Sequence, residues 1–257
     1  MTRLSVNLNK VAVIRNARGG QRPSVLDAAR IVVDAGAAGL TVHPRPDQRH
    51  ITARDVFDIA ALIRDEFPHI EFNIEGNPAA PANDGGYPGF DHFIERIRPT
   101  QATLVPDADD QLTSDHGWDL TAYNEPLARR IASYQALGVR VSLFLDPDLA
   151  QIEAARAHGS DRIELYTGPY AEAVWSHGTD DSRTQEILEC YLSAARHAAG
   201  LGLGVNAGHD LDLTNLSTIC SNGDIDEVSI GHALISDALK YGLFETTRKY
   251  LTLLPSD

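Results

Sequence analysis

The sequence predicts an α/β protein in which eight parallel strands close into a (β/α)8 barrel. Short apolar segments alternate with amphipathic segments along the chain, and this alternation is typical of a parallel sheet with helical crossovers. Eight segments of each kind fit a closed barrel better than an open doubly wound sheet, since no Gly-x-Gly-x-x-Gly sequence follows the first strand. A length of 257 residues also suits one barrel. We therefore expect a single TIM-barrel domain over residues 1–257, with extra helices and loops.

Local composition places the individual elements. Strands are expected in short β-prone runs, and helices where apolar residues recur with helical spacing. The expected strands are residues 4–8, 39–43, 70–75, 101–105, 139–145, 161–166, 203–206 and 225–230. The expected helices are residues 24–36, 53–66, 89–97, 121–137, 148–158, 184–199, 212–220 and 232–253. Candidate N-cap or first-turn residues are Ser24, Thr52, Asp148 and Asp212.

Two connections, residues 76–89 and 167–183, exceed the usual loop length. The first follows the third strand and is rich in Gly and Pro. Long connections within a compact domain are usually lids, binding loops or interfaces. We expect one of these roles for each segment.

Composition excludes several classes of function. A formal net charge of −14 argues against a nucleic-acid partner, which requires a basic surface. It does not argue against a small phosphorylated ligand, because a local group of Arg and His sets the field in a cleft. No run approaches 18 apolar residues and no apolar signal region begins the chain, so we expect no membrane association and a cytoplasmic enzyme.

A basic segment follows the second expected strand. That strand ends at His43, and two prolines, which cannot donate to a ladder, stop it at once. Arg45 and His50 lie in the rigid loop that follows, so fixed cations are expected just outside the sheet edge. A phosphate-handling site requires such cations. A solvated charged turn is the alternative reading of this segment alone.

Polar residues occur at the expected end of nearly every strand, whereas strand interiors are mostly apolar. In a barrel, the carboxyl ends of all strands meet at the face where the βα loops build the site. Glu75 and His209 have small neighbours, which favours function over solvation, and Glu164 faces the lumen or the helices depending on register. The residues at strand ends or in the loops that follow are Asn7, Asn9, Lys10, His43, Arg45, Glu75, Thr113, Ser114, Asp146, Glu164, Asn206, His209, Gly231 and His232.

A second anion site is expected at the start of the last helical segment. Gly231 precedes His232 there, and the N–H groups and dipole of a helix N-terminus attract anions. Near the first connection, Arg15 and Arg18 add guanidinium groups, unless their Gly-Gly loop is only a flexible tether. No His-x-His or His-Glu-x-x-His spacing indicates a metal site, and acid–base chemistry by the same groups needs no metal.

Seven segments occur in order along almost the whole chain: V-N-L-N-K-V-A-V-I-R-N-A-R-G-G, T-V-H-P-R-P-D-Q-R-H-I-T, N-I-E-G-N-P, L-V-P-D, R-I-E-L-Y-T-G, V-N-A-G-H and I-G-H-A-L-I. Together they resemble the pyridoxine 5′-phosphate synthase family. The resemblance implies a barrel with added helices that assembles as a homo-octamer, a tetramer of dimers. It implies condensation of 3-amino-2-oxopropyl phosphate with 1-deoxy-D-xylulose 5-phosphate to pyridoxine 5′-phosphate, phosphate and water. No metal or organic cofactor is implied.

The resemblance also assigns roles to residues. His43 and Glu75 would accept protons, His209 would donate one, and Glu164 would steady a cationic or imine-like transition state. The loop after the fourth strand would act as a lid. Deoxyxylulose phosphate would be held by Arg45, His50 and Thr113, with Asn9 and Lys10 replacing the Asp-His of better-known members. The amino-ketone phosphate would be held by Asn7, Arg18, Gly231 and His232, with Asp210 standing where the family usually has Gly.

Two other functions fit parts of the pattern. The first is another phosphosugar barrel enzyme, such as an isomerase or aldolase. A Schiff-base aldolase needs a Lys at a strand end, and Lys10 is the candidate. A non-catalytic binder of B6 phosphate is the other. Such a binder would not need the proton-transfer set of His43, Glu75 and His209, which this chain has.

Overall fold

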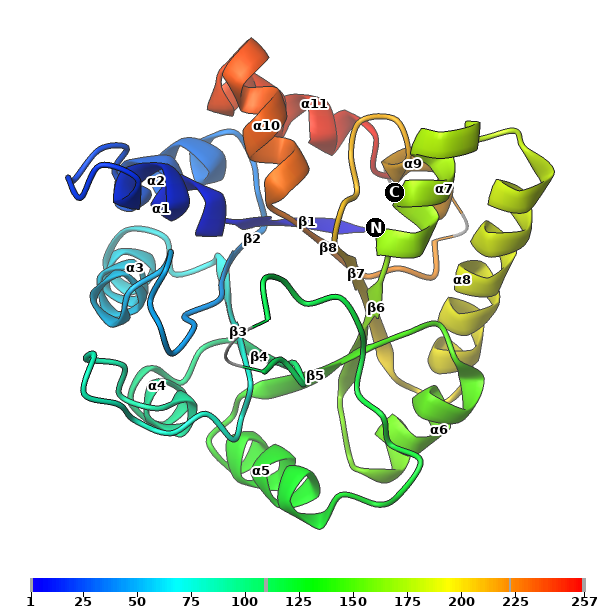
Figure 1. The fold of residues 1–257 in the computed structure, drawn as a ribbon, viewed down its shortest axis with the longest axis horizontal. Coiled ribbons are helices and arrows are strands. Elements are labelled where there is room, and N and C mark those ends of the chain that lie inside the picture. The colour runs from blue at the N-terminus through cyan, green and yellow to red at the C-terminus, as the bar shows by residue number, and fades with distance from the viewer. Residues whose placement is uncertain (1, 109–110, 222, 256–257) are drawn as a thin grey trace.

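Eight parallel strands form a closed barrel in which consecutive strands pair and β1 pairs with β8. The computed structural model describes residues 2–108, 111–221 and 223–255. Helices surround the barrel (Figure 1). The strands are β1 (Arg3–Asn7), β2 (Gly39–Val42), β3 (Glu71–Gly76), β4 (Gln101–Leu104), β5 (Arg140–Leu145), β6 (Arg162–Tyr166), β7 (Gly204–Gly208) and β8 (Glu227–Ile230). The predicted barrel is confirmed.

The outer layer is helical, and among the described residues no helix is long and apolar enough to cross a membrane. The helices are α1 (Asn9–Asn16), α2 (Val25–Asp34), α3 (Ala53–Glu66), α4 (Phe90–Ile97), α5 (Glu125–Ala136), α6 (Leu149–Ala157), α7 (Gly168–His177), α8 (Ser182–Gly200), α9 (Leu216–Ile219), α10 (His232–Tyr241) and α11 (Leu243–Thr252).

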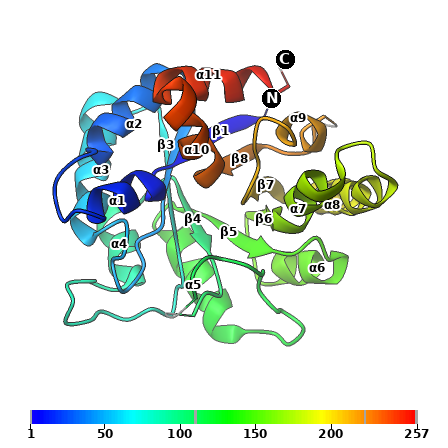
Figure 2. The ribbon, with the colours of Figure 1, turned by 45° about the horizontal axis from the view of Figure 1, so that its top comes forward.

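Three expectations about the elements are wrong. Asn9 and Lys10 begin helix α1 instead of extending the end of the first strand. The long connection 167–183 is mostly helix α7, which starts with a proline in its first turn, where a missing N–H needs no partner. The single helix expected over 232–253 is two helices, because Gly242 adopts φ +82° and ends α10. Helices α10 and α11 then pack side by side (Figure 2).

Three of the four expected helix starts are confirmed. The side chains of Ser24, Thr52 and Asp148 are the N-caps of α2, α3 and α6, and each accepts a backbone N–H. Asp212 also accepts backbone N–H groups, including that of Asn215 at 3.1 Å. However, it lies ahead of α9, whose N-cap is Asn215. Short polar side chains thus determine where most of these helices begin.

The strands alternate between mainly polar residues that face the lumen and apolar residues that face the helices. Inside, the hydroxyls of Ser5 and Thr41 lie 2.7 Å apart, and Thr103 donates to Asn73 Oδ1 at 3.1 Å. Outside, residues such as Val6 belong to the buried core between strands and helices. Residues i and i+2 of a strand share one face, so the polar row inside each strand runs to its carboxyl end. Apolar strand interiors are therefore found only on the outward face.

Ion pairs fill the amino end of the lumen. The Glu71 carboxylate pairs with Arg3 and with Arg140, and Arg162 Nη1 donates to Asn206 Oδ1 at 2.7 Å. Asn206 was expected at the end of its strand but lies in the middle of β7, within this network. The charges at the amino end are therefore paired with one another, which leaves the carboxyl end as the open end of the lumen.

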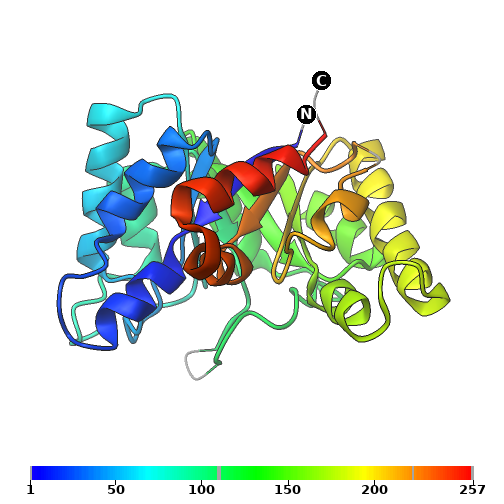
Figure 3. The same cartoon turned by 90° about the horizontal axis from the view of Figure 1, so that it is seen from above.

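The connection between β4 and α5 projects beyond the carboxyl end of the barrel, and β1 begins at the opposite end (Figure 3). Residues 109 and 110 of this predicted lid lie outside the described residues. Where this connection leads back toward α5, it is bonded to β5, because Trp118 N donates to Phe144 O at 2.9 Å. A Cβ at Gly117 would lie 2.4 Å from the Leu145 backbone, so only glycine permits this approach.

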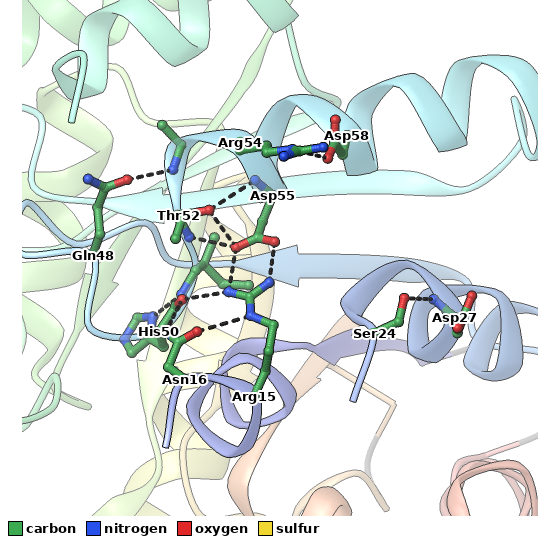
Figure 4. Close-up of polar contacts among 12 residues, drawn as sticks. Arg15, Asn16, Ser24, Asp27, Gln48, His50, Thr52, Arg54, Asp55 and Asp58 are labelled. Atoms are coloured by element: carbon green, nitrogen blue, oxygen red, sulfur yellow. Dashed lines mark hydrogen bonds and ion pairs between the residues drawn. The ribbon is translucent and has the colours of Figure 1, made fainter. Parts of the chain in front are cut away.

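A polar cluster ties α1 to α3 and to the segment that carries His50 (Figure 4). Arg15 Nη2 donates to Asp55 Oδ2 at 2.8 Å and to His50 O at 3.2 Å. Asp55 also completes a capping box with Thr52, whose backbone N–H donates to Asp55 Oδ2 at 2.8 Å. Arg15, expected in a loop beside the site, is therefore used to hold the basic segment in place.

We expect Thr52→Ala to lower the free energy of unfolding by about 1 kcal/mol, because one N-terminal N–H of α3 loses its acceptor. Chemical denaturation measures this change. Thr252→Ala, which alters an exposed threonine in the last turn of α11, is the matched control. Equal stability losses in the two variants would contradict the assigned cap.

Candidate active site

A cavity of about 570 Å³ opens at the carboxyl ends of the strands. The lining residues expected from the sequence are Asn7, Asn9, Lys10, His43, Arg45, His50, Glu75, Thr113, Ser114, Glu164, His209, Asp210, Gly231 and His232. Arg49, a further cation of the basic segment 43–50, also lines the cavity. The lining residues that sequence reasoning missed are Val13, Thr103, Val105, Leu112, Phe144 and Ser229. Thr103 and Ser229 lie on inward rows of β4 and β8, so knowledge of the strand register would have found them.

Besides Arg15 and Asn206, whose positions are given above, the candidates Asp146 and Arg18 do not line this cavity. Asp146 follows β5, and its Oδ2 accepts the Gly117 backbone N–H at 3.1 Å. Arg18 is the one of these to which the resemblance assigns a substrate. It lies in the turn after α1, its side chain is exposed, and it is absent from the cavity lining. Its assignment to a phosphate stays a prediction from the family resemblance.

Amide side chains connect the first three strands at the cavity. Asn9 Oδ1 accepts the His43 backbone N–H at 2.9 Å, and Asn7 Oδ1 accepts the Asn9 backbone N–H at 3.0 Å. Asn7 Nδ2 reaches Glu75 Oε2 at 3.3 Å. The same carboxylate oxygen lies 3.9 Å from His43 Nδ1. Glu75 and His43 are therefore held close enough to exchange a proton through a bound ligand or a water.

Two buried carboxyls, those of Glu75 and Glu164, line the cavity. Burial raises the pKa of Glu75 to about 7, with a further contribution from the charge of Asp107, against the opposing effect of Arg45. Burial also raises the pKa of Glu164 well above its usual range, as do the nearby charges of Glu75 and Glu227. A carboxyl with a pKa near neutrality can both accept and return a proton.

The two histidines on the basic segment are uncharged. Burial, together with the charges of Arg45 and other nearby cations, lowers the pKa of His43 well below its usual value. The same causes lower the pKa of His50 to about 4. The Ile51 backbone N–H donates to His50 Nδ1 at 2.9 Å, which leaves the proton of the neutral ring on Nε2. His43 is therefore a free base, and His50 is a neutral donor.

His209 occupies a strained turn at the end of β7. His209 and Asp210 have φ of +87° and +61°, which few non-glycine residues adopt. His209 Nδ1 lies 2.7 Å from Asp210 Oδ2, and its Nε2 lies 2.9 Å from the Thr113 hydroxyl of the lid. Next to it, a Cβ at Gly208 would lie 2.4 Å from Glu164 Oε1. The turn therefore aims the imidazole into the cavity while leaving room for Glu164.

Cationic groups lie at two places around the opening. Arg45 and Arg49 extend from the loop after β2, and both donate to Gln111 O, at 3.2 and 2.9 Å. At the second place, helix α10 begins with His232 directly after Gly231, so its N-terminus faces the opening. Lys10, in the first turn of α1, lies close enough to both His50 and Asp210 for its charge to lower the pKa of each. Among the described residues, no group of three or more His, Cys, Asp or Glu side chains is placed to hold a metal ion.

A closed barrel with titratable side chains gathered in one cavity at the carboxyl ends of its strands is the arrangement of a TIM-barrel enzyme. A solved 3-hexulose-6-phosphate synthase matches it with a TM-score of 0.60 at 12% identity, over 99% of this chain and 100% of that chain. At this identity the likeness supports the fold alone.

Sequence comparison identifies the family. The model of the pyridoxal phosphate biosynthesis protein PdxJ matches residues 4–256. The chain is 54% identical to a pyridoxine 5′-phosphate synthase of Xanthomonas campestris pv. campestris, over 98% of this chain and 96% of the relative. It is 48% identical to the Cytophaga hutchinsonii pyridoxine 5′-phosphate synthase, over 98% of each chain. The chain belongs to the PdxJ family, and the predicted family of vitamin B6 synthases is confirmed.

Glu75→Gln is expected to make the fold more stable above pH 7. Between the usual carboxyl pKa and about 7, the unfolded chain has released this proton while the folded chain retains it. Stability is therefore lost as pH rises through this window, and the neutral amide removes that loss. The melting temperature of the variant relative to wild type should be higher at pH 8 than at pH 5.

Glu186→Gln, which changes an exposed side chain on α8, is the control for this experiment. Its melting temperature relative to wild type should be the same at both pH values. A Glu75→Gln difference that does not change between pH 5 and pH 8 would refute the raised pKa.

Proposed function

We propose that the cavity condenses 3-amino-2-oxopropyl phosphate with 1-deoxy-D-xylulose 5-phosphate to give pyridoxine 5′-phosphate, phosphate and water. Membership of the PdxJ family supports the reaction. The observation that carries the proposal is the convergence of Glu75, His43, Glu164 and His209 on one cavity lined by cationic side chains. Imine formation, enolisation, phosphate loss and dehydration each require a proton to move, and these four groups can move it.

Glu75 and His43 suit the role of proton acceptors. His43 is neutral, and the pKa of Glu75 is about 7, so neither requires a strong driving force to take a proton at neutral pH and return it. Their separation of 3.9 Å lets both face the same reacting carbon or nitrogen. Asn7, which bonds Glu75, would orient that carboxylate.

Glu164 suits the role of a carboxylate that stabilises positive charge on the reacting substrate. Burial and the nearby charges of Glu75 and Glu227 raise its pKa, and the residue is 3% exposed. A cationic imine placed beside it would favour the ionised carboxylate, because an opposite charge lowers the pKa of a carboxyl. The carboxylate would then stabilise the charge that develops in the transition state.

His209 suits a proton donor that is coupled to the lid. Asp210 fixes its ring through Nδ1, which leaves Nε2 facing the cavity and Thr113. A substrate oxygen that replaces the Thr113 hydroxyl would take the same position relative to Nε2. Closure of the 105–120 connection over bound substrate would exclude water from reactive intermediates.

The two groups of anion-attracting residues around the opening fit the phosphates of the two substrates. Arg45 with His50 and Thr113 would hold deoxyxylulose phosphate, with Asn9 and Lys10 nearby. The helix N-terminus at Gly231 and His232, together with Asn7, would hold the amino-ketone phosphate, since backbone N–H groups and the dipole attract anions there. Arg18 would have to approach this site from its exposed turn.

Assembly and location are part of the same proposal. We infer a single-domain protein of the cytoplasm that forms a homo-octamer, a tetramer of dimers. The support is the family resemblance, together with exposed apolar side chains on α10 and α11: Leu239 is 81% exposed and Phe244 is 44% exposed. Burial of such side chains favours association.

The test is to mix the purified protein with both phosphorylated substrates and to follow phosphate release and the pyridoxine phosphate chromophore. We expect product with wild type and a rate at least about 100-fold lower with Glu75→Gln, because a proton acceptor is lost. Glu186→Gln should retain the wild-type rate. Binding of both substrates without product would indicate a carrier, and conversion of deoxyxylulose phosphate alone would indicate an isomerase or aldolase.

A further inference from the structure

We infer that Asp107 is a positioning residue of this site, holding the Arg45 guanidinium in place from behind the cavity wall and joining it to the lid. The inference rests on the proposed function, in which Arg45 meets a substrate phosphate. Asp107 is 4% exposed and does not line the cavity, whereas Arg45 and Ser114, the two residues its carboxylate binds, both do.

One carboxylate oxygen makes both contacts. Asp107 Oδ2 pairs with Arg45 Nη2 and accepts the Ser114 hydroxyl at 2.7 Å. The Asp107 carbonyl accepts Asn77 Nδ2 at 3.0 Å, which fixes the main chain where the lid begins. Arg45 Nη1 donates to Gln111 O at 3.2 Å. The flexible arginine is therefore held at two points, and less side-chain entropy is lost when it binds a phosphate.

The second carboxylate oxygen of Asp107 adds little to the stability of the fold. Asp107 Oδ1 is buried and has no hydrogen-bond partner among the described residues. Burial of an incompletely satisfied carboxylate is unfavourable, and an apolar pair in place of a buried ion pair is often as stable. A charged group retained at such a cost is best explained by what it does to Arg45 and to the site.

Asp107 also affects the pKa of Glu75, the proposed proton acceptor in the cavity. After burial, its negative charge is the largest cause of the raised pKa of Glu75. The residue that orients the phosphate-binding cation therefore also makes Glu75 retain its proton to higher pH. Phosphate binding and proton transfer are linked through one side chain that contacts neither substrate.

Asp107→Asn tests this inference, because the amide keeps the size and one oxygen acceptor but removes the charge. We expect the KM for deoxyxylulose phosphate to rise about tenfold or more, with little change in the KM for the amino-ketone phosphate. The acidic limb of the pH profile of kcat/KM should move to lower pH, since Glu75 loses a repelling charge. Asp107→Glu, which restores the charge, should recover part of both effects.

Asp119→Asn is the matched control, an exposed aspartate on the same connection whose carboxylate accepts hydrogen bonds from Thr121. It should leave both KM values and the pH profile unchanged. A structural role alone would lower the melting temperature of Asp107→Asn without moving the acidic limb. That result, or tighter binding of deoxyxylulose phosphate, would overturn the inference.

Calorimetric binding of deoxyxylulose phosphate separates this inference from the proposed function. Weaker binding to Asp107→Asn than to wild type supports the positioning role even if wild type forms no product, in which case only the proposed reaction fails. Product formation by wild type with equal substrate affinity in the two proteins would leave the reaction intact and reject the role of Asp107.

Discussion

The site depends on the burial of carboxyl groups within a closed barrel whose inward face is polar. Closure removes these groups from water, and the ionised form of a buried carboxyl is costly unless a cation or several donors compensate it. Glu75, Glu164 and Glu227 face the same lumen, so each also disfavours ionisation of its neighbours. Their raised pKa values follow from this crowding and burial together.

Buried carboxyl groups are compensated differently at the two ends of the lumen. At the amino end, Glu71 is paired directly with Arg3 and Arg140, and its pKa is lowered despite burial. At the carboxyl end, neither Glu75 nor Glu164 pairs with an Arg or Lys among the described residues. Asn7 donates an amide N–H to Glu75 at 3.3 Å, and Thr103 donates its hydroxyl to Glu164 at 3.4 Å. Cations there are placed at the cavity wall instead. Ion pairs thereby stabilise the amino end of the lumen, while the carboxyl end keeps carboxyl groups that can exchange protons.

Backbone strain is also concentrated at the open end. His209 and Asp210 both adopt positive φ, at a cost on the order of 1 kcal/mol each. Thr167 compensates from the neighbouring strand end, because its hydroxyl donates to the carbonyl oxygens of Gly208 and His209, at 2.7 and 2.5 Å. The turn places the His209 imidazole in the cavity that Glu164 also lines. Stability is given up where the geometry of the site requires it.

The sequence by itself determined the eight strands, the caps at Ser24, Thr52 and Asp148, and most of the cavity-lining residues. These depend on neighbours within a few positions, and the carboxyl ends of parallel strands in a barrel necessarily meet at one face. Only the tertiary structure decided the partners of Arg15 and Arg45, which lie 40 and 62 positions away along the chain. It also decided which row of each strand faces the lumen, and hence the places of Thr103 and Ser229, and it brought Asp107, in the loop after β4, against Arg45. Such contacts depend on register and closure, because a shift of one residue would turn every inward side chain outward.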